Sequence, residues 1–519
     1  MRKCIDVSPA LTSCRSVSFE YKTDIRQPVH PSDTTMALFQ SILVLVLCQL
    51  AISQDDVLFD SANMDPKATQ IYDALIPSFE GKEGVDSFFT GLIQLGELQR
   101  QLLGVRDHPL RESPRKRFRS FLGRENPPMQ APYLFQGDLI LTKDQMNGLI
   151  SSARQEVAEK AGVPVEERAK RALIPHMHRR WNQFPIPYTV DEDVDLAVVQ
   201  AGLAQWSDNT CISFEHKKFI TRGIKFVYSH GCFSSLGMTG GVQTISIGRG
   251  CGLAGIVAHE VGHALGLHHE QARYDRDDYV RVLFENIDDG MYSAFVKHKP
   301  FDMVTHGVGY DYGSIMHYEA TAFSRGFFDE SETISTKDPN FIDTIGQREA
   351  LSFKDIKKVN FGYCNSTCST KLDCQNGGYI DPKNCSACKC PDGFGDRICD
   401  KLIRSERYCG DQVHYARHNE KTLAQYGDGN CYYIIKAPRG YKIKLNIDTV
   451  HFNKWTACAD EYVEIRYGTD LGATGARLCK NKIIKEEQIS KTNKVIVIYR
   501  AKRRTRNFSI RYSLTKKSF

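Results

Sequence analysis

The stretch that begins at His259 reads HEVGHALGLHHE and decides what kind of domain this chain contains. Residues four apart on an α-helix share a face, so His259 and His263 can both direct a nitrogen towards one metal ion. Glu260 is next to the first histidine, where its carboxylate can hold a metal-bound water rather than the metal. Gly266 lets the chain leave the helix in a conformation that other residues resist, which returns His269 as a third nitrogen ligand. Three protein ligands and a water are the arrangement of a catalytic zinc site, because a closed structural site needs a fourth protein ligand.

A second motif supports this interpretation. A short His-Glu-x-x-His match alone would also fit an amphipathic helix with scattered histidines, but here five positions of the longer pattern agree at once. Downstream, the run SIMHY from Ser314 to Tyr318 follows two glycines, Gly309 and Gly313. The extended helix motif and a later Met-turn together define the metzincin class of zinc peptidases.

The residue after the third histidine separates the metzincin families, and here it is Glu270. Together with SIMHY and with the run HEQARYDRD, it gives the chain a close resemblance to the astacin family over roughly residues 135–364. The resemblance implies an α+β catalytic domain whose two lobes enclose a zinc cleft. It also implies that one Zn²⁺ is bound by His259, His263 and His269.

The same resemblance assigns roles to three further residues. The counterpart of Tyr318 in that family is an additional zinc ligand that moves away to stabilise the transition state. The counterpart of Met316 forms an apolar floor beneath the metal. Glu260 would then be the general base that takes a proton from the nucleophilic water and passes it to the leaving amine.

Composition limits the class of protein. With 519 residues, the chain is long enough for three or four modules. Its 68 lysines and arginines nearly balance 62 acidic residues, so nothing indicates a nucleic-acid surface. Of 17 cysteines, all except Cys4, Cys14 and Cys48 lie from Cys211 onward, which favours disulfides and an oxidising compartment.

The N-terminus predicts secretion. The apolar run from Ala37 to Ile52 is too short for a membrane span and fits a signal-peptide core that ends in a small-residue cleavage site at Ser53. We therefore assign residues 1–53 to an N-terminal extension and signal peptide. Translation can start at Met1 or at Met36, and a signal anchor is the alternative. No later segment is apolar enough to span a membrane.

Residues 54–171 are interpreted as a propeptide. Helix-like patterns run from Val85 to Leu103 and from Lys143 to Lys160, and a basic, proline-rich connector from Pro109 to Pro132 separates them. The run FQGD that ends at Asp138 resembles the astacin latency motif F-x-G-D. Asp138 could donate a carboxylate to zinc in place of the catalytic water, which keeps a zymogen silent; an ordinary glycine turn is the alternative interpretation.

The run RAKR that ends at Arg171 is a candidate site for a furin-like or trypsin-like activating protease. A solvated basic surface is the alternative, and Arg180 offers another cleavage site. Cleavage after Arg171 would make Ala172 the new N-terminus and Trp181 its tenth residue, which matches the mature start of the family. The freed ammonium in that family reaches, through water, the glutamate that Glu270 matches.

The catalytic domain is expected over residues 172–364. Its patterning predicts a strand, a helix and a second strand at Ile186–Val190, Asp195–Asn209 and Ile224–Tyr228. The stretch Gly250–Gly266 is expected to contain the active-site helix. Six cysteines in residues 365–402 resemble an EGF-like module, although close cysteines could also bind zinc. Residues 409–515, with strand patterns at Tyr441–Ile447, Glu461–Tyr467 and Lys494–Tyr499, resemble a CUB domain, an all-β sandwich.

Sequence alone does not fix the connectivity of the cysteines. The family resemblances imply seven disulfides: Cys211–Cys364, Cys232–Cys251, Cys368–Cys385, Cys374–Cys388, Cys390–Cys399, Cys409–Cys431 and Cys458–Cys479. Asp460 and Glu461 are either part of a calcium site or ordinary exposed acids at a strand start. Asn365 and Asn507 begin N-glycosylation motifs.

Taken together, these patterns predict a secreted zinc endopeptidase that is made as a zymogen. The order of modules resembles many nematode astacins, which implies extracellular matrix, cuticle collagen or egg-coat proteins as substrates. The competing hypothesis is a catalytically silent adhesion protein that acts through its EGF-like and CUB modules. Such a protein usually lacks a ligand or the base, whereas all of these residues are present here.

Overall fold

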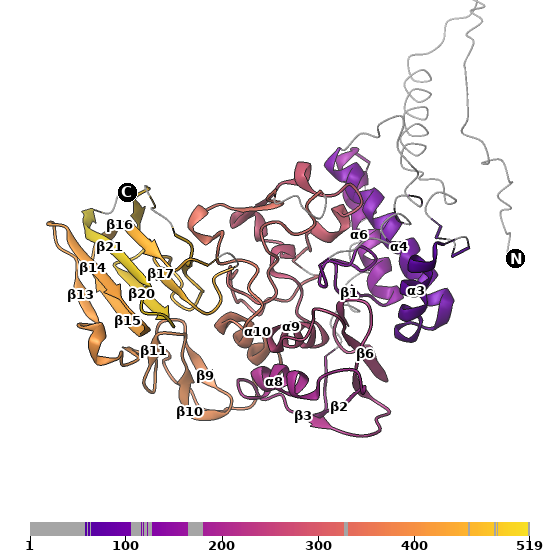
Figure 1. Cartoon of the computed structure of the whole chain (residues 1–519), viewed down its shortest axis with the longest axis horizontal. Helices are drawn as coiled ribbons and strands as arrows, with labels where there is room; N and C mark the ends of the chain where they lie inside the picture. The colour runs from indigo at the N-terminus through magenta and orange to yellow at the C-terminus, as the bar shows by residue number, and fades with distance from the viewer. Residues whose placement is uncertain are drawn as a thin grey trace, which may run out of the picture.

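The structure is a computed structural model of the 519-residue chain (Figure 1). It describes residues 58–59, 61–62, 64–104, 116, 118, 122, 127–163, 180–300, 302–325, 331–454, 457–481, 484 and 486–516. The predicted signal peptide, the alternative start at Met36, the RAKR run and Ala172 lie outside these residues. So does most of the proline-rich connector.

The described residues of the N-terminal segment 58–163 are largely helical. They include α3 (Pro66–Leu75), the short 3₁₀ helix η1 (Ile76–Ser78), α4 (Gly81–Leu103) and α6 (Lys143–Lys160). The two long helices confirm the two helical patterns in the sequence. Thr142 and Gln145 form a capping box at the start of α6, which satisfies amide groups that a helix end leaves free.

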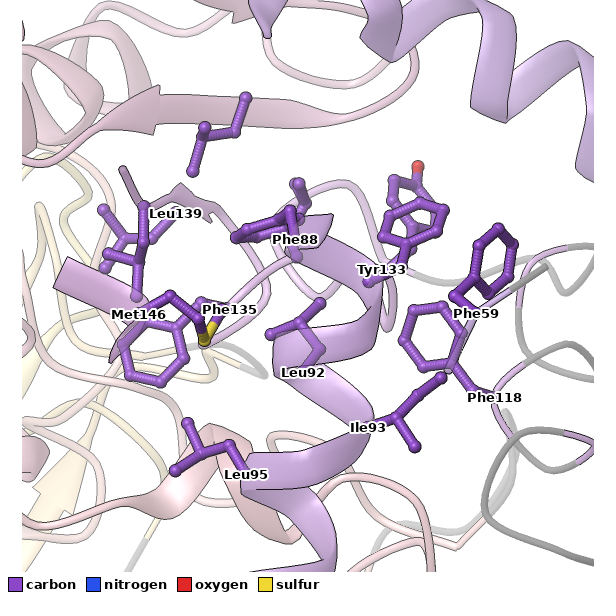
Figure 2. Close-up of a cluster of buried hydrophobic side chains, with 14 of the residues drawn as sticks. Phe59, Phe88, Leu92, Ile93, Leu95, Phe118, Tyr133, Phe135, Leu139 and Met146 are labelled. Carbon is purple, nitrogen blue, oxygen red and sulfur yellow. The ribbon is translucent and has the colours of Figure 1, made fainter. Parts of the chain in front are cut away.

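These helices enclose their own core (Figure 2). Phe59, Phe89 and Phe118 pack ring against ring, and Leu92 on α4 belongs to the same cluster. Gly91 allows α4 and α6 to approach closely, because a Cβ at this position would meet Met146 Cγ at 2.4 Å. The core of the segment continues into the central domain, because Phe233, Leu236 and Val296 belong to the same cluster of buried side chains.

The central domain contains a six-stranded sheet in the order β1-β5-β6-β4-β2-β3. The strands are β1 (Leu139–Ile140), β2 (Ile186–Val190), β3 (Phe214–His216), β4 (Gly223–Val227), β5 (Cys232–Ser235) and β6 (Val242–Ile247). The predicted strands at Ile186–Val190 and Ile224–Tyr228 are confirmed as β2 and β4. Strand β1 belongs to the N-terminal segment and pairs in parallel with β5 at the sheet edge.

Three α-helices complete this domain: α8 (Leu196–Ser207), α9 (Ala254–Ala264) and α10 (Phe353–Tyr363). The expected helices at Asp195–Asn209 and within Gly250–Gly266 correspond to α8 and α9. A two-stranded sheet is formed by β7 (Val280–Val282) and β8 (Ile334–Thr336). Short 3₁₀ helices lie at Glu270–Ala272, Arg276–Asp278, Phe284–Asn286, Tyr292–Phe295 and Pro339–Phe341.

Two disulfides hold the central domain. Cys211 and Cys364 join the loop after α8 to the end of α10, and Cys232 and Cys251 join β5 to the loop before α9. Each closes a loop of the chain, which restricts the unfolded state. Both pairs are those that the family resemblance implies.

A small disulfide-rich segment follows, over residues 365–402. It contains β9 (Tyr379–Asp381), β10 (Asn384–Lys389), β11 (Phe394–Gly395) and β12 (Lys401–Leu402). Its disulfides are Cys368–Cys385, Cys374–Cys388 and Cys390–Cys399. Because all six thiols are oxidised in pairs, none is available to bind zinc.

The C-terminal part is a β-sandwich that begins after the 3₁₀ helix η7 (Arg407–Cys409). One sheet has the order β13-β15-β20-β17-β18, with bounds Val413–Tyr415, Gly429–Lys436, Lys494–Ala501, Tyr462–Arg466 and Ala476–Leu478. The other has the order β14-β21-β16-β19, with bounds Lys421–Tyr426, Asn507–Lys516, Tyr441–His451 and Gln488–Ile489. Cys409–Cys431 and Cys458–Cys479 are its disulfides.

The two terminal parts lie on opposite sides of the central domain in Figure 1, with the indigo helices on one side and the orange and yellow sandwich on the other. The active-site helix α9 is in the middle. Within the described ranges, no helix combines the length and the apolar character that crossing a membrane requires.

Candidate metal centre

Helix α9 presents the first two histidines on one face. Both rings are buried, and their Nε2 atoms are 3.1 Å apart. His259 Nδ1 lies 2.8 Å from the carbonyl oxygen of Ile315, and His263 Nδ1 lies 2.8 Å from that of Leu267. Because only a protonated Nδ1 can donate to a carbonyl, each Nε2 is left with a lone pair that faces the centre of the site.

The turn after α9 delivers the third histidine. Gly266 has φ of 94°, a conformation that favours glycine, and its amide donates to the carbonyl of His263. The next amide, of Leu267, donates to the carbonyl of Gly262. This pair of bonds is a Schellman motif, which ends the helix and reverses the chain. His269 is thereby placed beside the other two rings.

Asp138 completes the cluster from the N-terminal segment. Its Oδ2 lies 3.2 Å from His259 Nε2 and 3.0 Å from His269 Nε2, and its Oδ1 lies 3.6 Å from His263 Nε2. One ligand atom from each of the four residues lies within 4.8 Å of the others. All four residues are buried.

The donor set fits a zinc ion. Three imidazole nitrogens and one carboxylate oxygen match the tetrahedral preference of Zn²⁺. Burial lowers the pKa of His259 to about 3 and that of His269 to about 4, so both rings are neutral at pH 7, the form that ligates. Asp138 Oδ1 is buried and has no hydrogen-bond partner within the described residues, which is costly unless a cation satisfies it.

Glu260 lies beside this cluster and is not one of its four members. Its side chain is completely buried, and neither carboxylate oxygen has a hydrogen-bond partner in the described part of the chain. Burial raises its pKa well above the usual value, and the charge of Asp138 raises it further. A carboxyl group of this kind is suited to accept and return a proton near neutral pH.

Tyr318 contacts both the centre and the N-terminal segment. Its ring centroid is 4.7 Å from that of His269, and its hydroxyl donates to the carbonyl oxygen of Gln136 at 2.5 Å. Gln136 also places its Oε1 2.9 Å from His269 Nδ1. Burial raises the pKa of Tyr318 well above its usual value, so its hydroxyl remains a hydrogen-bond donor.

Met316 lies under α9. A Cβ added to Gly262 would meet Met316 Sδ at 3.1 Å, so the thioether packs against the helix that carries the two histidines. The turn itself is held by Asp355, which accepts from the Ser314 hydroxyl and from the Ile315 amide. These contacts hold the methionine turn against α9, and the role of Met316 as an apolar floor beneath the metal stays a prediction.

Glu270 has partners that the sequence analysis did not identify. Its Oε2 contacts Lys358 Nζ, its Oε1 accepts from the Asp311 amide at 2.8 Å, and Arg273 Nη1 lies 3.5 Å from Oε1. Burial would raise the pKa of Glu270, but the charges of Lys358 and Arg273 outweigh it and lower the pKa. Lys358 lies 88 residues further along the chain, and no local motif marks it.

Arg348 is a second residue that the sequence analysis missed. It donates to the carbonyl of His317 at 2.8 Å. Burial lowers its pKa, and the charges of Asp138, Glu319 and Glu260 oppose this shift. A guanidinium therefore contributes positive charge at the edge of the metal centre.

The candidate calcium ligands in the sandwich are occupied by cations of the chain. Asp460 contacts Lys454 and Lys502, and Glu461 contacts Arg506. Glu461 is buried and Asp460 is half-buried, so they are not the ordinary exposed acids of the simpler interpretation. The calcium site stays a prediction.

Three histidines from a helix and its following turn, above a methionine turn in an α+β domain, define a metzincin-type zinc protein. Residues 174–364 match the family described as Astacin, a peptidase family, and residues 407–512 match the CUB domain. The expected catalytic fold and the expected all-β sandwich are thus confirmed. The EGF-like assignment of residues 365–402 stays a prediction.

Relatives with curated names lead to the same family. Zinc metalloproteinase nas-34 of Caenorhabditis elegans is 42% identical over 400 residues, which cover 75% of this chain and 65% of that protein. Zinc metalloproteinase nas-36 of Brugia malayi is 37% identical over 397 residues, 71% of this chain and 68% of that protein. The chain thus spans about two thirds of the length of these relatives. It belongs to the astacin family, whose zinc metalloproteinases use Zn²⁺.

Among solved structures, high choriolytic enzyme 1 is similar to part of the chain. This hatching enzyme zinc-protease from the medaka fish Oryzias latipes is 36% identical, and the match covers 36% of this chain and 96% of that one with a TM-score of 0.34.

Proposed function

We propose that this protein is a secreted zinc endopeptidase that is made as a zymogen and cleaves extracellular proteins. The observation that carries the proposal is the position of Asp138, whose carboxylate lies 3.0 to 3.6 Å from the Nε2 atoms of the three histidines. A carboxylate from a separate segment fills the place that a working site keeps open. Beside it, Glu260 is buried, and among the described residues its carboxylate has no hydrogen-bond partner, so both oxygens are available to a water molecule.

In the active form, His259, His263 and His269 would hold the zinc. When bound, zinc supplies a Lewis acid that polarises the scissile carbonyl and lowers the pKa of a water molecule. Glu260 takes the proton of the attacking water on its carboxylate and delivers it to the nitrogen of the leaving amine. Its raised pKa suits both transfers.

Tyr318 acts on the substrate oxygen. Its hydroxyl is protonated and, in the present structure, donates to Gln136 of the N-terminal segment. Departure of that segment frees the hydroxyl, which can then donate to the oxyanion that develops on the substrate carbonyl. The same residue thus serves latency and turnover.

Latency in the proposed zymogen rests on three contacts of one short stretch. Asp138 occupies the centre, Gln136 binds Tyr318 and approaches His269, and β1 covers the edge of β5. The carbonyl of Asp138 accepts from the Ser234 amide at 2.9 Å, which anchors the stretch to that edge. An extended substrate would need the same edge, so segment and substrate exclude each other.

Release of the segment requires proteolysis. We assign the cleavage to Arg171, by a furin-like or trypsin-like protease, with Ala172 as the new N-terminus. Both residues lie outside the described ranges. The basic run and the spacing to Trp181, whose indole donates to the Ala264 carbonyl at 2.9 Å, support this assignment.

Secretion is supported by the predicted signal peptide, by seven disulfides and by the CUB domain. Asn365 is exposed and Asn507 half-buried, so both are proposed glycosylation sites. The substrate class is proposed to be matrix, cuticle-collagen or egg-coat protein. The disulfide-rich segment, as an EGF-like module, and the CUB domain would assist substrate choice.

The experiment that tests this function is sequencing of all N-termini in a mixture of extracellular proteins after incubation with the processed protein. The matched control is Glu260→Ala, which keeps the three histidines. New N-termini that appear only with the wild type would establish proteolysis. A correctly processed, zinc-loaded protein that creates none would favour the silent adhesion protein instead.

A further inference from the structure

We propose that one end of the CUB sandwich binds an acidic peptide segment of another protein, and that this segment also carries aromatic or large apolar side chains. The site is a groove of about 650 Å³ beside the edge strand β13, the β13 groove. Its volume is in the range of clefts that hold ligands. The proposal goes beyond the proposed function, because it concerns binding at a surface remote from the metal centre and involves no catalytic step.

The β13 groove lies at the edge of the sandwich that faces away from the catalytic domain. In their sheet, β13 is the first strand and β18 is the last. Thr474, just before β18, donates to Asp311 of the catalytic domain. Figure 1 shows β13 on the outer side of the sandwich. A partner in the groove would therefore leave the metal centre uncovered.

Cations without acidic partners surround the groove. Lys436 on β15 is directly opposite Lys494 on β20, and like charges in this position repel each other. Arg417 adds a third positive charge, and His418 lies next to it. Among the described residues, no aspartate or glutamate lines the groove or forms an ion pair with these side chains. An anionic partner would relieve this repulsion.

The two lysines lie on the outer face of their sheet. Their neighbours along the strands, Ile435 and Val495, belong to the core of the sandwich. Successive side chains of a strand alternate between the two faces, so Lys436 and Lys494 are directed away from that core. Elsewhere on the outer face, Ile496 is buried against the disulfide-rich segment, but none of the described residues of that segment lines the groove. The lysines therefore remain accessible to a partner.

The walls of the groove are mainly apolar. Ala437, Pro438 and Leu514 contribute to them. Tyr415 is 59% exposed and is the register partner of Lys436, so an aromatic ring and an ammonium lie side by side at the rim. An apolar side chain that entered the groove would leave water, which is favourable.

The combination of charge and apolar walls favours a peptide over a sulfated polysaccharide. A polysaccharide could neutralise the cations, but its polar groups would gain nothing from apolar walls. An acidic peptide can direct carboxylates to Lys436 and Lys494 and an aromatic ring to Tyr415. In addition, β13 is an edge strand, and such strands leave backbone groups with which an extended peptide can pair.

The test measures the binding of three labelled polymers to the full-length Glu260→Ala protein, so that no probe is cleaved. The probes are a random copolymer of glutamate and tyrosine, polyglutamate of the same length, and heparin. At about 0.15 M salt, we expect the copolymer to bind at least about tenfold more tightly than polyglutamate, because only the copolymer brings apolar side chains. Higher salt should weaken the binding of polyglutamate more than that of the copolymer.

Two variants in this background locate the site. Lys436→Glu combined with Lys494→Glu should weaken copolymer binding at least about tenfold. Tyr415→Ser should weaken it several-fold and should leave polyglutamate binding unchanged. The matched control, Arg503→Glu combined with Arg504→Glu, reverses two exposed charges beyond the other end of β20 and should stay within about twofold of the unmodified background.

Unfolding midpoints show whether each variant is folded, and Lys436→Gln combined with Lys494→Gln replaces the charge reversal if that variant does not fold. Equal losses in the groove and control variants would reveal a general attraction to positive charge and would overturn the proposal. The absence of copolymer binding would overturn it too. Tighter binding of heparin that is lost in the groove variant would assign the groove to a sulfated polysaccharide instead. None of these measurements depends on peptide cleavage, so they remain valid if the proposed function fails.

Discussion

The N-terminal segment and the CUB domain both contact the active-site region, but they do so from opposite sides and with different chemistry. The segment inserts Asp138 among the three histidines and binds Tyr318 through Gln136. The CUB domain stays outside, where Thr474 donates through its amide to Asp311 at 3.0 Å. In the proposed zymogen, the first contact blocks the site and has to be removed, whereas the second supports the rear of the site and can remain during turnover.

Asp311 makes the rear contact relevant to the site. Its side chain receives the hydrogen bond from Thr474, and its own amide donates to Glu270. Two further interdomain contacts, Lys354 with Asp470 at 2.7 Å and the Tyr467 hydroxyl with Asp338 at 2.6 Å, hold the CUB domain in place. The two neighbours thus contact different parts of the site: Asp138 lies among the metal-binding histidines, and Thr474 binds the loop that precedes the methionine turn.

The largest effect is expected when the blocking contact is broken. Asp138→Ala in the unprocessed chain removes the carboxylate from a buried cluster, an interaction worth about 3–5 kcal/mol, so peptide cleavage by the uncut protein should rise by roughly 10²- to 10³-fold. Cleavage of a fluorogenic peptide measures this. Asp144→Ala, which changes an exposed acid of the same segment, is the control and should leave the uncut protein silent. Equal activity of both variants would mean that Asp138 is not the block.

A somewhat smaller effect is expected for Tyr318, which binds Gln136 of the N-terminal segment and is proposed to bind the oxyanion during catalysis. In the processed enzyme, Tyr318→Phe should lower kcat by about 10²-fold, because one donor to the oxyanion is lost. Zinc content should stay near that of the wild type, since three histidines remain. Measurement of kcat together with zinc by atomic absorption checks both, and loss of the metal would argue against the proposed role.

A change in the contact between the CUB domain and the methionine turn should have a weaker effect on activity. A Cβ on Gly313 would meet Thr474 Oγ1 at 2.5 Å, so Gly313→Ala forces the CUB loop away from the methionine turn. Such overpacking costs about 1–3 kcal/mol, and we expect a few-fold lower kcat/KM and a lower melting temperature. Thr474→Gly provides room, so the double variant should recover part of both. Strict additivity of the two changes would show that the contact does not couple the domains.

The smallest effect on activity is expected inside the CUB domain, where pH acts on stability. Burial would raise the pKa of Glu464, but Arg466 and Arg477 outweigh it and lower the pKa to about 2. Its unfolded pKa is about 4.3, so this group stabilises the folded state fully above that value. The contribution is lost as the pH falls from about 4.3 to about 2.

Unfolding midpoints between pH 7 and pH 2 measure this contribution. Glu464→Gln should destabilise the protein at pH 7 and should weaken the pH dependence below about pH 5. Glu486→Gln, at an exposed position of the same domain, should change neither. An unchanged acid limb in Glu464→Gln would contradict the assignment.

The sequence predicts those site residues that lie close together along the chain or that stand in a known motif. His259, His263 and His269 share one helix and its turn, so the periodicity of a helix and one glycine are enough to bring them together. Asp138 was found because it stands in a recognisable motif, although it lies 131 residues before His269. The bounds of α6 and of β2 were also predicted correctly.

What the sequence did not predict are contacts between distant residues without a motif. Lys358 and Glu270 are 88 residues apart, and Thr474 and Asp311 are 163 apart. Each is an ordinary polar residue whose partner is chosen by tertiary packing. The pairing of β1 with β5 is similar, since a two-residue strand carries no periodicity of its own.

Latent proteolysis is tested best by peptide cleavage with the same preparation before and after cleavage at Arg171, with zinc determined in both states and Glu260→Ala treated in parallel. We predict about one zinc per chain throughout, cleavage only after processing, and none with Glu260→Ala. A protein that is correctly processed at Ala172, loaded with zinc and still inert towards a broad peptide library would contradict the claim that it is a latent zinc endopeptidase.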